Sequence, residues 1–170
     1  MPQTRLAVFA SLLSGLTAVA LTPMHARAST RSSSGAWSVQ CCDKTNPQRD
    51  CGGFTLDLVQ DGNRLCGEHP IATVGLRRLD KGSPGSVLGS ADGNKATVVI
   101  EAARTGARYL TTAEHSDVRL KWRIVGMVNT GESSEPIIIP QQTVLARDAQ
   151  RKTAAHLQDV KDAPWRWLDD

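Results

Sequence analysis

The chain has 170 residues, of which 20 are Lys or Arg and 17 are Asp or Glu, so its formal net charge at pH 7 is only +3. A charge this small argues against a polycationic protein that binds nucleic acid over its whole surface. The length is enough for one domain with a real hydrophobic core, even after subtraction of an N-terminal targeting segment.

Residues 1–28 have the three parts of a secretory signal peptide. Arg5 supplies the positive charge, an apolar run extends from Leu6 to Leu21, and Ala26-Arg27-Ala28 fits an A-x-A cleavage site. The apolar run is short for a membrane span, although an uncleaved anchor is the alternative. We therefore expect a mature chain that begins near Ser29, is periplasmic or secreted, and has no stable membrane insertion. Cleavage removes two arginines and no acid, which leaves 18 basic against 17 acidic residues.

The clearest structural signal is a hairpin at Phe54–Gly67, where apolar and polar residues alternate on each side of Asp61-Gly62. Asp-Gly suits a type I′ turn, because both central positions of that turn need a positive φ. A two-residue turn at this point places Leu65 opposite Leu58 on the face that would be buried. The same unit is then repeated along the chain.

Two further hairpins are predicted downstream. Ser86–Glu101 contains a second Asp-Gly turn, and Ala107–Ile124 turns near its centre. A loop at His115-Ser116 pairs Tyr109 with Trp122. The second strand of this hairpin then alternates apolar and basic residues, which is the pattern of a half-buried antiparallel strand.

The pattern divides the mature chain into three regions. A Ser-rich stretch at residues 29–35 is expected to be a flexible lead. A β-domain follows at residues 36–146, with its first strand at 36–41 and its last near 141–146. Residues 147–170 hold the one helical pattern, which Pro164 ends, and a tail rich in tryptophan.

These elements amount to about seven or eight short strands and one C-terminal helix. A mainly β antiparallel meander of this kind closes into a barrel or folds into a sandwich, because open strand edges invite aggregation. We favour a small barrel of the up-and-down type. In architecture alone, it resembles the small secreted calycin-like barrels, and a shared fold does not specify a function.

Four cysteines, Cys41, Cys42, Cys51 and Cys66, are predicted to form two disulfides, because their number is even and the chain is exported. The alternation of side chains along the strands favours Cys42 with Cys66 and Cys41 with Cys51. A zinc site made of these thiols and His69 is the alternative, and the absence of a C-x-x-C pair weighs against it.

The sequence contains no recognisable catalytic set. There is no G-x-S-x-G elbow, phosphate loop, dinucleotide fingerprint or calcium loop, and we expect no metal or cofactor. The run Glu114-His115-Ser116-Asp117 has the residue types of a hydrolase triad, but neighbours on a tight turn cannot line up as nucleophile, base and orienting acid. Glu68 and His69 are a second, weaker acid–base candidate.

Binding residues are predicted on three features: a basic outer face, the turn of the third hairpin, and the tail. Basic side chains on an exposed face can orient an acidic partner, and Trp and Arg are enriched in interface hot spots. The candidates are Arg108, Arg119, Lys121, Arg123, Glu114, His115, Trp165 and Trp167.

The favoured function is therefore an exported, non-enzymatic binding protein, most simply an inhibitor or immunity-type protein that acts on a protein partner, an enzyme of the cell envelope. Loops on a stiff scaffold are where recognition usually occurs. The first alternative is a lipocalin-like carrier of a small apolar ligand, since an eight-stranded barrel can enclose one. The second alternative is a hydrolase with an unrecognised site.

Overall fold

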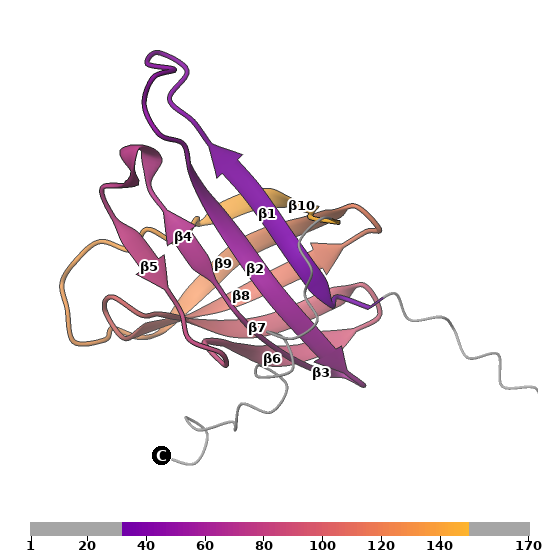
Figure 1. Ribbon diagram of the computed structural model, residues 1–170. Helices are drawn as coiled ribbons and strands as arrows, with labels where there is room; N and C mark the ends of the chain where they lie inside the picture. The colour runs from indigo at the N-terminus through magenta and orange to yellow at the C-terminus, as the bar shows by residue number, and fades with distance from the viewer. Residues whose placement is uncertain (1–31, 150–170) are drawn as a thin grey trace, which may run out of the picture.

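The computed structural model describes residues 32–149, and these fold into a closed, eight-stranded antiparallel barrel. The barrel strands follow one another around the ring in chain order (Figure 1). They are β1 (Gly35–Cys41), β2 (Gly52–Asp61), β3 (Arg64–Glu68), β6 (Val87–Asp92), β7 (Lys95–Ala102), β8 (Ala107–His115), β9 (Arg119–Asn129) and β10 (Gln142–Arg147). The up-and-down barrel predicted from the sequence is confirmed.

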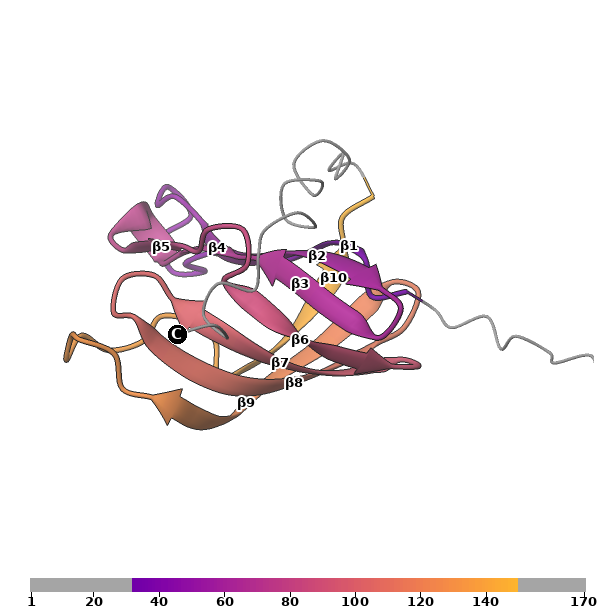
Figure 2. The same cartoon turned by 90° about the horizontal axis from the view of Figure 1, so that it is seen from below.

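Strand β1 closes the ring, because it pairs with β2 on one side and with β10 on the other. Two short strands, β4 (Pro70–Ala72) and β5 (Leu79–Lys81), extend the sheet beyond the ring, with the 3₁₀ turn η1 (Val74–Leu76) between them. β4 continues the register of β3 along β2, so it is the far end of the same strand, interrupted at His69. Figure 2 shows β4 and β5 projecting at one end of the barrel.

The hairpin turns differ from prediction by one position. Asp61 pairs with Arg64 and Asp92 pairs with Lys95, so the loop residues are Gly62-Asn63 and Gly93-Asn94. Only the glycine of each turn has a positive φ, +61° at Gly62 and +60° at Gly93, which fits a type II′ turn with glycine first rather than type I′. Leu65 consequently lies opposite Gln60 instead of Leu58.

In the third hairpin, the observed pairing of the two strands differs from the predicted pairing by four residues. Trp122 pairs with Ala113 rather than Tyr109, and the chain turns at Asp117-Val118. An even shift leaves every side chain on its predicted face, because side chains alternate with a period of two. The predicted faces of the two strands therefore stand, while the predicted neighbours do not, and Val118, predicted on the core face, is 64% exposed because it lies in the turn.

The barrel interior is filled by one hydrophobic cluster drawn from every strand of the ring. Its largest fully buried members are Trp37, Phe54 and Trp122, each with at most 1% of its surface exposed. The rings of Phe54 and Trp122 meet edge to face, 5.6 Å apart between centroids. Truncation of such a side chain typically costs about 3–5 kcal/mol, so this contact is a major source of stability.

The predicted disulfide pairing is wrong. Cys42 is bonded to Cys51, because β1 and β2 pair Cys41 with Gly52 and thereby bring the two cysteines that flank this pair face to face, 4.3 Å apart between Cα atoms. Cys66 lies opposite Val59, along the β2–β3 ladder and away from Cys42. Its Sγ is 3.8 Å from the Val59 carbonyl oxygen, while Cys41 is an exposed thiol.

Several predictions concern segments outside the described residues. These are the signal peptide at 1–28, residues 29–31 of the lead, nearly all of the predicted C-terminal helix, and the tail with Trp165 and Trp167. Within residues 32–149, no helix is long and apolar enough to cross a membrane.

We predict that the oxidised protein contains one disulfide and that its remaining thiols differ in reactivity. Reduction should add about 2 Da, since a disulfide lacks two hydrogens. Cys41 should be alkylated rapidly at neutral pH. Burial and the nearby Asp61 charge raise the pKa of the half-buried Cys66 thiol, so its alkylation should be slower and should accelerate as the pH rises. A gain of about 4 Da with no alkylation before reduction would instead establish two disulfides.

Candidate functional site

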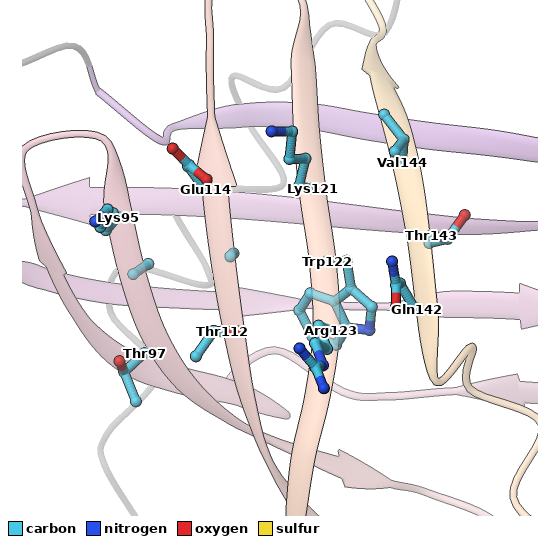
Figure 3. A pocket seen from close by; sticks show the side chains of 12 residues that line it. Lys95, Thr97, Thr112, Glu114, Lys121, Trp122, Arg123, Gln142, Thr143 and Val144 are labelled. Carbon is cyan, nitrogen blue, oxygen red and sulfur yellow. The ribbon is translucent and has the colours of Figure 1, made fainter.

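A groove of about 630 Å³ crosses the outer face of the barrel wall formed by β7, β8, β9 and β10. Two rows of side chains from paired positions line it, as Figure 3 shows. The first row is Lys95, Glu114, Lys121 and Val144, and the second is Thr97, Thr112, Arg123 and Gln142.

Strand alternation creates these rows. Ala96, Ala113 and Trp122 face the barrel interior and are buried, so the residues on either side of them must face outward. Trp122 is fixed further by its indole N–H, which donates to the Pro140 carbonyl oxygen at 3.1 Å. The floor of the groove is therefore part of the core, while its walls are exposed and polar apart from Val144.

The groove carries an excess of positive charge. Lys95, Lys121 and Arg123 are exposed, and Glu114 is the one acid among the lining residues, placed between the two lysines in the register. Within residues 32–149, no ion pair involves any of the three cations. These charges are therefore available to an anionic ligand, next to the hydroxyl and amide groups of the second row.

The structure separates the predicted basic face into different places. Arg123 and Lys121 lie in the groove, and Arg119 lies at the rim, where its backbone exchanges hydrogen bonds with Ser116. Arg108 also points outward, as predicted, but lies toward the other end of β8 and forms an ion pair with Glu101 at 2.9 Å. Arg108 is not among the residues that line the groove.

The predicted turn residues also separate. Glu114 points into the groove, whereas His115 points inward and is 5% exposed, with its ring 6.1 Å from that of Trp37. The Ser116 amide donates to the Arg119 carbonyl at 2.7 Å, and the Arg119 amide donates to Ser116 Oγ at 3.2 Å. Ser116 thus closes the turn, which is the structural role that the sequence favoured over a hydrolase triad.

Glu68 and His69 do not form an acid–base pair, because adjacent strand residues face opposite sides. Instead, His69 is fully buried between Asp80 and Ser86, a contact that the sequence analysis missed. His69 Nε2 lies 3.4 Å from Asp80 Oδ1, an ion-pair distance rather than a well-directed hydrogen bond, and Nδ1 lies 3.3 Å from Ser86 Oγ.

This line of acid, imidazole and hydroxyl resembles a catalytic triad in composition but is sealed inside the fold. Ser86 is 5% exposed and Asp80 is 3% exposed. Gly82 packs directly on the contact, since a side chain at that position would collide with Ser86 Oγ and His69 Nδ1. Asp80 also accepts hydrogen bonds from the amides of Ala103 and Arg104, at 3.0 and 3.5 Å. The cluster therefore holds β5 against the β7–β8 turn, and its role is structural.

Among residues 32–149, no group of three or more His, Cys, Asp or Glu side chains is arranged to hold a metal ion. Comparisons with protein-family models, with curated proteins and with solved structures find no match to this chain. A functional assignment must therefore come from the geometry of the groove and of the surfaces around it.

We predict that Asp80 makes the protein less stable in acid. Burial on its own would raise the pKa of this carboxyl, but the His69 side chain and the two backbone amides together hold the pKa below its usual value. Because the folded state then binds the proton more weakly than the unfolded chain, the stabilisation is present above the unfolded-state pKa. It is lost as the pH falls through the folded-state pKa.

Asp80→Asn should lower the free energy of unfolding by about 1–3 kcal/mol at pH 7 and flatten its decline in acid. Urea unfolding followed at several pH values measures both effects. Asp92→Asn, the same change at an exposed site, is the control. An acid profile identical to that of the unchanged protein would show that Asp80 is not a source of the pH dependence.

Proposed function

We propose that this protein is an exported, non-enzymatic binding protein whose basic groove binds an acidic segment of a protein partner. The observation that carries the proposal is the set of three exposed cations, Lys95, Lys121 and Arg123, which have no ion-pair partner in residues 32–149 and lie along one groove. Cations held close together on a low-dielectric wall attract an acidic partner and orient it during encounter.

The surroundings of the groove favour a macromolecular partner over a small anion. The turns at Gly62-Asn63, Gly93-Asn94 and Asp117-Val118 emerge at the same end of the barrel, where the Ala91 amide donates to the Asn63 carbonyl at 2.8 Å and the His115 amide to the Asn94 carbonyl at 2.9 Å. Lys95 directly follows one of these turns. Groove and turns thus form a continuous, rigid surface long enough to contact another protein.

An inhibitor or immunity-type role fits this surface best. A closed barrel that carries a disulfide changes little on binding, so it loses little conformational entropy when its turns enter a cleft. The filled interior supports this role over that of a lipocalin-like carrier, because Phe54 and Trp122 meet where an enclosed ligand would lie. The buried Ser86 likewise gives no support to a hydrolase.

The experiment begins with the oxidised mature protein on a solid support, exposed to envelope and secreted fractions. We expect one stoichiometric enzyme to be retained and inhibited. Capture of no protein, together with lipid in an organic extract of the support-bound chain, would contradict the proposal and favour the carrier.

For the retained partner, Lys121→Glu with Arg123→Glu should weaken binding by about tenfold or more, which is ~1.4 kcal/mol or more, and should reduce its salt dependence. Calorimetry over a range of salt concentrations measures both quantities. Lys44→Glu with Arg77→Glu makes the same charge change at exposed positions near the opposite end of the barrel and should leave the Kd within about twofold. Equal effects of the two double variants would exclude the groove as the binding surface.

A further inference from the structure

A short hairpin projects from the end of the barrel that lies away from the turns beside the basic groove. Strands β4 and β5 form its arms, and η1 forms its tip (Figure 2). Gly53, at the start of β2, pairs with Ala72 of β4, whereas Asp61, at the end of β2, adjoins the first of those turns. The hairpin and the turns therefore lie at opposite ends of the barrel.

The hairpin exposes two leucines. Leu76 and Leu79 have 49% and 58% of their surfaces exposed. Leu79 points outward, because the next residue along β5, Asp80, is buried on the other face. Beside Leu79 the surface forms a hollow of about 290 Å³ that is lined in part by Pro70 and Ala72. The hairpin therefore presents apolar surface to the solvent at its tip and along its outer face.

An unusual backbone conformation holds Leu76 in this exposed position. Its φ is +52°, the one positive value among the non-glycine residues of the described part of the chain. Leucine rarely adopts this left-handed region, where glycine or asparagine is usual. The Leu76 amide donates to the Thr73 carbonyl oxygen at 2.8 Å, and the Gly75 amide donates to the Asp50 carbonyl oxygen at 2.7 Å. A large apolar side chain is thus kept where strain opposes it, which is typical of functional positions.

Cations accompany the leucines on the hairpin. Arg77 and Arg78 lie between them in the sequence, and Lys81 is on the same face of β5 as Leu79. Among residues 32–149, none of these three cations has an ion-pair partner. Asp80 is the one acid between residues 73 and 81, and it is buried. The exposed surface of the hairpin is therefore both apolar and basic.

Acidic residues around the hairpin do not offset this charge. Arg104, which donates to the Leu79 carbonyl oxygen at 3.3 Å, forms an ion pair with Glu135 at 2.6 Å. In the adjoining loop between β1 and β2, basic and acidic residues are equal in number. The hairpin therefore keeps an excess of positive charge.

We infer that the hairpin docks the protein on an anionic phospholipid bilayer, with Leu76 and Leu79 in the interface and the neighbouring cations against lipid phosphates. Apolar side chains next to Lys and Arg are the combination that binds such an interface, because burial of apolar surface adds to attraction by anionic headgroups. Charge favours a bilayer over a second copy of the chain, since two copies that met through this hairpin would bring like charges together.

Docking in this way leaves the basic groove accessible. The turns beside the groove lie at the opposite end of the barrel from the hairpin, so they point away from the bilayer. The contact is peripheral, and no segment needs to cross the membrane. The inference is independent of the proposed function, because lipid binding is measured on vesicles and partner binding is measured without them.

Flotation of the mature full chain with phospholipid vesicles tests the inference. Vesicles of equal parts phosphatidylglycerol and phosphatidylcholine should bind the protein about tenfold or more tightly at low salt than vesicles of phosphatidylcholine alone. Added salt should weaken the binding, because it screens the attraction between the cations and the headgroups.

Leu76→Gln with Leu79→Gln removes the apolar surface at similar side-chain size and should weaken binding to the anionic vesicles by about tenfold or more. Val118→Gln with Val144→Gln changes two exposed valines away from the hairpin and should leave binding unchanged. Leu76→Asn is a second variant. Asparagine tolerates the left-handed backbone, so this protein should unfold at the same or a higher urea concentration and still bind lipid more weakly.

Arg77→Gln with Lys81→Gln should also weaken binding by about tenfold or more, at roughly fivefold for each cation. Lys95→Gln with Lys121→Gln removes two cations near the other end of the barrel and is the control. No binding to anionic vesicles, equal binding to neutral ones, or equal losses from the hairpin and control variants would overturn the inference. A dimer that the leucine variant abolishes, with no lipid binding, would also overturn it, because the leucines would then contact a second copy.

Discussion

The structure depends on the pairing of β1 with two strands that lie far from each other in the sequence. On one side, Trp37 is opposite Leu56, and on the other it is opposite Arg147, whose guanidinium lies 4.6 Å from the indole ring. The Trp37 N–H donates to the Ser33 carbonyl at 2.9 Å, so a fully buried side chain is also satisfied as a donor. Closure removes the free edges that an eight-stranded meander would otherwise expose.

Much of this fold follows from periodicity alone. Alternation of apolar and polar residues predicted which side chains of β2, β8 and β9 face the core, and those assignments are confirmed even where the pairing moved by two or four residues. Pairing itself depends on turn geometry. Asp-Gly can form the two loop residues of a type I′ turn, or its glycine can be the first loop residue of a type II′ turn, so the loop starts one position later. The faces could therefore be predicted, while the neighbours across the strands could not.

The candidate site shows the same limit. Lys121 and Arg123 were predicted to be exposed and basic, but their association with Lys95 and Gln142 depends on the register of three separate strand pairs. The Cys42–Cys51 bond, by contrast, follows directly from the β1–β2 register and could have been derived once that register was known. The His69–Asp80–Ser86 contact had no local signal, because it joins an interruption in one strand to a short added strand and a loop.

The distribution of charge over the two walls of the barrel also explains why the net charge predicted little about binding. The wall that carries the groove concentrates cations that have no ion-pair partner among residues 32–149, and the opposite wall holds Asp57 and Glu68, two buried carboxylates on adjacent strands, so opposite charges are segregated rather than absent. An overall charge near zero excludes a uniformly charged surface but not a local field strong enough to orient a partner. The exposed cations of the groove therefore present one sign of charge to the solvent at the surface where binding is proposed.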